Sequence, residues 1–133
     1  MILNILPIDP GITDVVKAYR FLKNRVRHTP TEYSFPLSEI CGAPVYIKWE
    51  NQQLCGSFKL RGALYKMNSL TPEERAKGVV TCSSGNHGQG VALAAKELGI
   101  RTQIFVPNVC PETKKSAIKR RGGEYVELVV TSG

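Results

Sequence analysis

Two short stretches of this chain carry residues whose types and spacing could do chemistry. The first is CGSFKLRGA, residues 55–63, in which Lys59 stands between a Gly-Ser turn and an Arg-Gly-Ala sequence. The second is SSGNHGQG, residues 83–90, in which polar side chains alternate with glycines. A lysine amine can act as a nucleophile, and a glycine-rich turn at the start of a helix can bind an anion.

Lys59 can act as a nucleophile only in its neutral form, which burial or a cationic neighbour favours. Phe58 and Leu60 give Lys59 apolar neighbours in the sequence. Arg61 is a weak candidate for the cationic neighbour, because residues two apart on a helix do not face each other. The local sequence leaves two interpretations open: an ordinary solvated helix lysine, and a lysine that forms a covalent bond.

The stretch 83–90 joins a predicted strand to a predicted helix. A helix N-terminus offers unpaired backbone N–H groups and a partial positive charge, and Gly85, Gly88 and Gly90 would let a ligand approach the backbone closely. Four polar side chains would stand at its mouth: Ser83, Ser84, Asn86 and His87. The spacing matches neither a dinucleotide fingerprint nor a P-loop. An anion-binding turn and a plain strand-to-helix turn both remain compatible with it.

The front half of the chain predicts short and mostly helical elements. They are expected as helices at 14–26, 37–40, 58–69 and 72–77, and as a strand at 45–49. Thr13 and Ser57 are the expected N-caps of the first and third helices, and Gly42 is expected to end the second. In the first helix the apolar residues share one face: Val15, Tyr19, Leu22 and Val26.

From residue 79 onward, strands and helices alternate. Strands are expected at 79–83, 102–107 and 124–130, and helices at 90–98 and 111–121. This alternation predicts the α/β class, with an open parallel βαβαβ sheet and flanking helices. The apolar run VVTCS suits a strand that is buried on both faces. Because three parallel strands would leave exposed edges, we expect the chain to be the front part of a longer protein.

The composition favours a globular protein with anionic partners, since 42% of the 133 residues are hydrophobic and the net charge is +7. The basic cluster at 114–121 follows an acidic residue and precedes two glycines, which is typical of a solvated helix that complements its own dipole. No aromatic residues are interleaved with these bases, so nucleic-acid binding is not expected.

The sequence also argues against a membrane protein, a secreted protein and a metal site. It contains no apolar stretch of 18 residues, and its apolar N-terminus has no basic lead, so neither a membrane span nor a secretory signal is expected. The four cysteines never form a CxxC pair, so no zinc or disulfide framework is visible. Free thiols in the cytoplasm are the plain interpretation.

The two motifs together, KWENQQLCGSFKLRGA at 48–63 and SSGNHGQGVALAA at 83–95, change the interpretation of Lys59. This array resembles the fold-type II pyridoxal-phosphate enzymes, and within them the serine/threonine dehydratase and serine racemase group. The resemblance runs from the helix near Asp14 to Gly122-Gly123. It implies a tryptophan-synthase-beta-like fold with pyridoxal 5′-phosphate as cofactor. Residues 1–78 would belong mainly to the larger domain of that fold, and residues 79–133 would begin a smaller βαβαβ domain.

The resemblance also implies roles for individual residues. Lys59 matches the lysine that forms the Schiff base with the cofactor and later acts as base at the substrate α-carbon. Phe58 matches the aromatic residue beside the cofactor ring, and Asn86 matches the asparagine that hydrogen-bonds its phenolic oxygen. Ser84 matches the acid/base on the opposite face in racemases of the group. The loop that grips the substrate carboxylate is matched by Ser83, Ser84, Gly85, Asn86 and His87.

The function implied by the resemblance is dehydration and deamination of serine or threonine to an α-keto acid and ammonia, by a cytoplasmic homodimer. The family's glycine-rich phosphate loop is expected beyond residue 133, so the chain alone is expected to be weak or inactive. Two alternatives stay open. One is a racemase or another pyridoxal-phosphate enzyme of β-elimination or replacement. The other is a non-catalytic association or regulatory module with the same fold.

Overall fold

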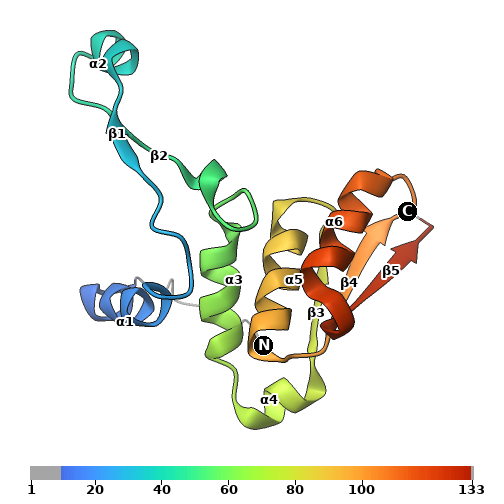
Figure 1. Ribbon diagram of the computed structural model, residues 1–133. Coiled ribbons are helices and arrows are strands. Elements are labelled where there is room, and N and C mark those ends of the chain that lie inside the picture. The colour runs from blue at the N-terminus through green and yellow to red at the C-terminus, as the bar shows by residue number, and fades with distance from the viewer. Residues whose placement is uncertain (1–9, 133) are drawn as a thin grey trace, which may run out of the picture.

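The computed structural model describes residues 10–132 (Figure 1). The apolar N-terminus, for which no secretory signal is expected, lies largely outside the described residues. The elements follow in the order α1 (Ile12–Leu22), β1 (Thr31–Tyr33), α2 (Phe35–Cys41), β2 (Tyr46–Lys48), η1 (Glu50–Gln52), α3 (Lys59–Asn68), α4 (Pro72–Lys77), β3 (Val79–Cys82), α5 (Asn86–Leu98), β4 (Thr102–Pro107), α6 (Glu112–Gly122), η2 (Gly123–Tyr125) and β5 (Val126–Thr131).

The back half forms the predicted parallel sheet. Its strands lie in the order β3-β4-β5, and Thr102 is in register with Val79 on one side and Val126 on the other. Both crossover helices, α5 and α6, contact the sheet and each other, and α3 packs on α5 (Figure 1). The predicted α/β class, with an open parallel βαβαβ sheet and flanking helices, is confirmed.

The prediction that the strand at VVTCS is buried on both faces is wrong. In β3, Val80 keeps 66% of its surface exposed. Val80 pairs with exposed Gln103 of β4, whereas Thr81 pairs with the buried Ile104. Paired residues of a parallel sheet point to the same side, and successive residues of a strand point to opposite sides. The face that carries Thr81 and Ile104 therefore lies under the helices. The face that carries Val80 and Gln103 is uncovered in residues 10–132.

The predicted N-terminal ends of α1, α3 and α5 are wrong. Helix α1 begins at Ile12 after Gly11, so Thr13 lies inside the helix and does not cap it. Helix α3 begins after Phe58 without a side-chain cap, while Ser57 is buried in the preceding turn and its carbonyl accepts the Cys55 thiol at 3.4 Å. Helix α5 begins at Asn86, four residues before the predicted start, because the expected turn already has helical geometry there.

Helix α1 also differs from its predicted extent and burial. It ends at Leu22, and only Leu22 and Val26 of the predicted apolar face reach the core. Val15 and Tyr19 remain mostly exposed. The helical turn at 37–40 is part of α2, which ends at Gly42 in the left-handed conformation as predicted.

An arm made of β1, α2 and β2 extends away from the helices and the sheet (Figure 1). Strands β1 and β2 pair antiparallel, and the Tyr33 and Tyr46 rings meet edge to face at 5.5 Å. Large apolar side chains on the arm are exposed: Tyr33, Phe35, Leu37, Ile40 and Tyr46. None of the helices in the described part of the chain has the length and apolar character needed to cross a membrane.

Candidate active site

Lys59 is the first residue of α3, where it is exposed and lines a cavity. The Lys59 Nζ lies 4.7 Å from the centre of the Phe58 ring. Lys59 and Phe58 line a cavity of about 380 Å³, whose lining also includes His87 and Val91 of α5. The structure therefore brings the predicted nucleophile and part of the predicted anion-binding turn to one place.

Gly90 is the residue that allows this approach. A β-carbon at position 90 would lie 3.1 Å from both the Leu60 nitrogen and the Lys59 carbonyl carbon. That distance is tight for any side chain, so α5 approaches the backbone of Lys59 more closely than a larger residue would allow. Lys59 and Gly90 are 31 positions apart in the sequence (90 − 59). The two motifs that contain them meet at this contact.

The turn that follows β3 is held in shape by Ser83. Its Oγ accepts hydrogen bonds from the backbone N–H groups of Gly85 at 3.3 Å and of Gly88 at 3.1 Å. A β-carbon at position 88 would lie only 2.3 Å from the Ser83 carbonyl oxygen. Because a hydroxyl has two acceptor lone pairs and one proton, both lone pairs serve the turn and the Ser83 proton stays available to another acceptor.

The other predicted site residues surround this turn in different environments. Ser84 and Gly85 are half-buried between β3 and α5, whereas Asn86 and His87 are exposed in the first turn of α5. Of the described residues, only Phe58, Lys59 and His87 among the predicted site residues line the cavity. The structure places Ser83, Ser84, Gly85 and Asn86 next to the cavity along the chain but not in its lining.

Sequence reasoning missed an ion pair beside Lys59. The Glu50 carboxylate accepts two hydrogen bonds from Arg61, at 2.9 Å from Nε and at 2.7 Å from Nη2. It also accepts one from the fully buried Thr29 hydroxyl, and the Lys48 Nζ lies 3.9 Å away. The predicted motif contained Glu50 and Arg61, but they are eleven residues apart (61 − 50) and no helical or strand spacing pairs them.

This ion pair changes the ionisation of Glu50. The hydrogen bonds from Arg61, opposed by burial and supported by the Thr29 hydroxyl, lower the pKa of Glu50 from 4.5 to about 2. The same hydrogen bonds raise the pKa of Arg61 above its ordinary value. The Glu50 carboxylate is therefore ionised over the whole physiological pH range. Because Arg61 is paired with Glu50, it does not serve as the cationic neighbour of Lys59.

The shifted Glu50 predicts a stability that depends on pH. A carboxylate whose pKa is depressed in the folded state stabilises that state fully above its ordinary pKa and loses the contribution as the pH falls toward the folded value. The shift of the Glu50 pKa from 4.5 to about 2 corresponds to roughly 3–4 kcal/mol at most, and solvent screening of this partly exposed carboxylate lowers that figure. We expect Glu50→Gln to unfold at lower urea concentration than the wild type at about pH 7, and the difference to shrink at about pH 3.

The control for this measurement is Glu97→Gln. Glu97 pairs with Arg25 at 3.6 Å, and both side chains are substantially exposed, so the loss should be no more than about 1 kcal/mol. An equal difference between Glu50→Gln and the wild type at both pH values would contradict the assigned ionisation of Glu50.

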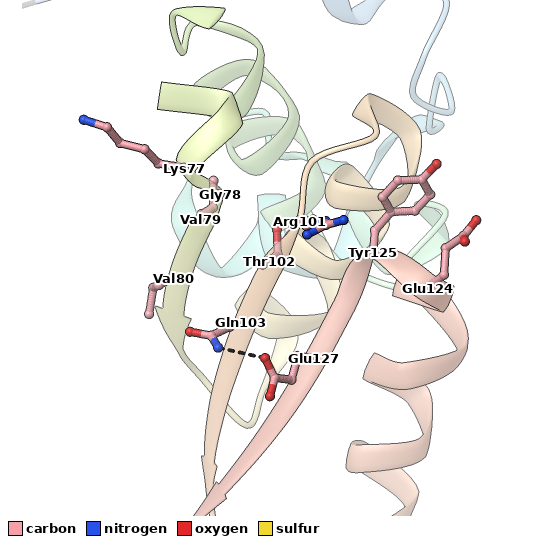
Figure 2. Close-up of a pocket in the computed structure, with 10 residues that line it drawn as sticks. All are labelled: Lys77, Gly78, Val79, Val80, Arg101, Thr102, Gln103, Glu124, Tyr125 and Glu127. Atoms are coloured by element: carbon pink, nitrogen blue, oxygen red, sulfur yellow. Dashed lines mark hydrogen bonds between the residues drawn. The ribbon is translucent and has the colours of Figure 1, made fainter. Parts of the chain in front are cut away.

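A second hollow lies elsewhere among the described residues, and none of the predicted site residues lines it. It has a volume of about 490 Å³ and lies at the amino ends of the parallel strands, where the Gln103 amide donates to Glu127 at 2.7 Å (Figure 2). The Lys77 side chain points away from it (Figure 2). The cavity at Lys59 is lined by three of the predicted site residues, Phe58, Lys59 and His87, and is therefore the better candidate for chemistry.

The residues of this cavity fit a cofactor that reacts with an amine. Lys59 has no carboxylate within ion-pair distance among residues 10–132, so its amine is not committed to a structural ion pair. Phe58, Ala63 and Val91 provide apolar walls for a flat ring. No group of three or more histidine, cysteine or acidic residues in the described chain could hold a metal ion.

A comparison of the sequence with known protein families agrees with the predicted fold and cofactor. Residues 22–133 match the family described as "Pyridoxal-phosphate dependent enzyme", and the chain belongs to this family. Pyridoxal phosphate is the cofactor of the family, which agrees with the cofactor that the sequence implied.

Within the family, the similar curated proteins include an L-threonine ammonia-lyase and L-threonine dehydratases. The chain is 45% identical over 115 residues to the L-threonine ammonia-lyase of Thermotoga maritima, covering 86% of this chain and 29% of the relative. It is 40% identical over 120 residues to the biosynthetic L-threonine dehydratase IlvA of Bacillus subtilis, covering 90% of this chain and 28% of the relative. The chain thus spans less than a third of the length of either relative.

Solved structures place the chain in the same group. The serine racemase from Dictyostelium discoideum superposes with a TM-score of 0.80 at 36% identity, over 89% of this chain and 38% of that one. The threonine deaminase from T.th. superposes with a TM-score of 0.77 at 35% identity, over 93% of this chain and 38% of that one. The predicted resemblance to the dehydratase and racemase group is confirmed.

Proposed function

We propose that this chain is the amino-terminal part of a pyridoxal-phosphate-dependent ammonia-lyase, which converts serine or threonine into an α-keto acid and ammonia. The observation that carries the proposal is the meeting of two segments. Lys59 at the start of α3 and His87 in the first turn of α5 line one cavity, and α5 contacts the Lys59 backbone closely at Gly90. The 45% identity to an L-threonine ammonia-lyase favours a hydroxy amino acid as substrate.

The cofactor side of the site would be formed by α3. Pyridoxal phosphate, when bound, supplies an electron sink that stabilises negative charge at the substrate α-carbon. In our proposal Lys59 would hold the cofactor covalently, and its amine, when free, would accept the α-proton. Phe58 would pack beside the ring, and Asn86 at the start of α5 would donate a hydrogen bond to the cofactor.

The substrate side would be formed by the turn before α5. Its unpaired backbone N–H groups and the partial positive charge of the helix N-terminus favour a carboxylate. We assign Ser84, Gly85, Asn86 and His87 to this carboxylate. The Ser83 proton, which the turn leaves free, can be donated to the same group. Holding the carboxylate there orients the α-hydrogen toward Lys59.

The test is formation of keto acid and ammonia from a panel of amino acids by the natural polypeptide that contains this chain, with pyridoxal phosphate added. Turnover of threonine or serine supports the proposal. Absence of both turnover and cofactor binding would instead support a non-catalytic module that kept the fold.

A racemase is the second candidate, and two observations favour it. Three of the similar solved structures are racemases, including an aspartate racemase at a TM-score of 0.79 and 36% identity. Ser84, the proposed acid/base on the opposite face, is half-buried within the turn. Chiral analysis of the same reactions distinguishes the candidates, because a racemase would accumulate the D-amino acid without stoichiometric keto acid.

We further propose the division into residues 1–78 and 79–133, a homodimer and a cytoplasmic location for the whole protein. The exposed apolar arm supports self-association, since large exposed apolar patches mark interaction surfaces. Light scattering on the purified protein would report its mass in solution, and a monomer at all concentrations would contradict the dimer.

A further inference from the structure

We propose that the Glu50–Arg61 ion pair is a positioning pair, which fixes the start of α3 so that the Lys59 amine faces the cavity. The inference rests on the proposed role of Lys59 as the point of cofactor attachment. Neither Glu50 nor Arg61 lines the cavity, so neither would touch the cofactor or the substrate through it.

The ion pair closes the loop that carries Lys59. Glu50 begins η1 and Arg61 lies in the first turn of α3, with the segment 53–58 between these two elements. This segment turns sharply at Gly56, where φ is 75°, and the Gly56 N–H donates to the Gln53 carbonyl at 2.8 Å. Because no side chain caps the N-terminus of α3, the bidentate contact from Arg61 is a polar anchor of its first turn, beside the buried Leu60.

The carboxylate is itself held by buried groups. The fully buried Thr29 donates its hydroxyl to Glu50, and Arg61 Nη2 donates to the Arg27 carbonyl at 3.4 Å. Gln53, which is 3% exposed, accepts from the Arg27 N–H at 2.8 Å and donates to the Arg27 carbonyl at 2.9 Å. Three separate stretches of chain therefore meet at one ion pair, which makes its geometry hard to change.

The backbone of Lys59 is thereby fixed from two sides. On one side α5 touches it at Gly90, and on the other side the ion pair restrains the residue two positions after it. Loss of the ion pair would leave α3 attached through its core residues Leu60 and Leu64 but would free the preceding loop. We therefore expect the helix to persist while the direction of the Lys59 side chain becomes variable.

The test compares Lys59 with Lys66, a lysine two turns further along α3 that lines the same cavity. The protein is mixed with pyridoxal phosphate and reduced with borohydride, and the label on each lysine is measured by peptide mass spectrometry. We expect a label ratio of Lys59 to Lys66 well above one in the wild type. In Glu50→Gln and Arg61→Ala the ratio should fall roughly tenfold or more, because misplacing a reacting group by about 1 Å can cost up to about 10²-fold.

Two further variants make the result specific. Arg61→Lys keeps the charge but not the bidentate fork, so it should restore only part of the ratio. Glu97→Gln removes an ion pair remote from the Lys59 loop and should leave the ratio unchanged. Circular dichroism confirms that each variant is folded under the labelling conditions, and if Arg61→Ala is unfolded, Glu50→Gln and Arg61→Lys decide.

The outcomes separate this inference from the proposed function. A wild type without preference for Lys59 would overturn the proposed attachment point and the positioning pair together. A wild type that prefers Lys59, with the same ratio in folded Glu50→Gln and Arg61→Lys, would overturn the positioning pair alone. Only a fall in both variants, with Glu97→Gln unchanged, supports it.

Discussion

Replacing Gly88 with alanine should destabilise the protein by about 3 kcal/mol or more, because the new methyl group has no space. The added β-carbon would lie 2.3 Å from the Ser83 carbonyl oxygen, which is backbone and cannot rotate away. The turn would have to open, and opening would break the hydrogen bond from the Gly88 N–H to the Ser83 Oγ. Urea unfolding followed by circular dichroism measures the loss.

The matched control is Gly85→Ala in the same turn. A β-carbon at position 85 would meet nothing within 4 Å, and the φ angle of −110° suits any residue. We expect Gly85→Ala to cost less than about 1 kcal/mol. Equal losses for the two variants would show that the turn is not packed as the structure has it, and the carboxylate site assigned to it would lose its support.

Replacing Lys59 with alanine should reduce formation of keto acid from threonine or serine by roughly 10³-fold or more. The proposed function assigns this amine both the attachment of the cofactor and the removal of the α-proton, so no other residue can take over its work. Steady-state assays of the natural polypeptide, with saturating pyridoxal phosphate, measure the effect.

Lys66→Ala is the matched control for that loss. Lys66 lies on the same helix and lines the same cavity, but the proposal gives it no role. Turnover should stay within a few-fold of the wild type. If Lys66→Ala lowered turnover as much as Lys59→Ala does, the loss would not be specific to Lys59. The chemical role assigned to the Lys59 amine would then lose its support.

Much of the fold could be predicted because its signals are local. The short helix α4 has a capping box between Thr71 and Glu74, and Gly99 ends α5 in the left-handed conformation. Such signals are read within a few residues of each other. The uncovered face at Val80 could not be predicted in the same way, because burial of a strand depends on which helices cover the sheet.

The candidate site was predictable in its parts but not in its geometry. The motifs around Lys59 and Ser83 indicated the candidate site residues. The resemblance to pyridoxal-phosphate enzymes predicted the type of reaction. The contact at Gly90 that joins the motifs, and the ion pair between Glu50 and Arg61, depend on how distant segments pack. No spacing in the sequence encodes such contacts, so only the structure shows them.

The central claim is that Lys59 and the turn before α5 form one site, and amide NMR tests it most directly. We expect pyridoxal phosphate to shift the backbone amide signals of Gly85 and Gly88 in the wild type and to leave them unchanged in Lys59→Ala. Shifts confined to the hollow at the amino ends of the strands, for example at Gly78 and Arg101, would contradict the claim. So would shifts at Gly85 and Gly88 that persist in Lys59→Ala.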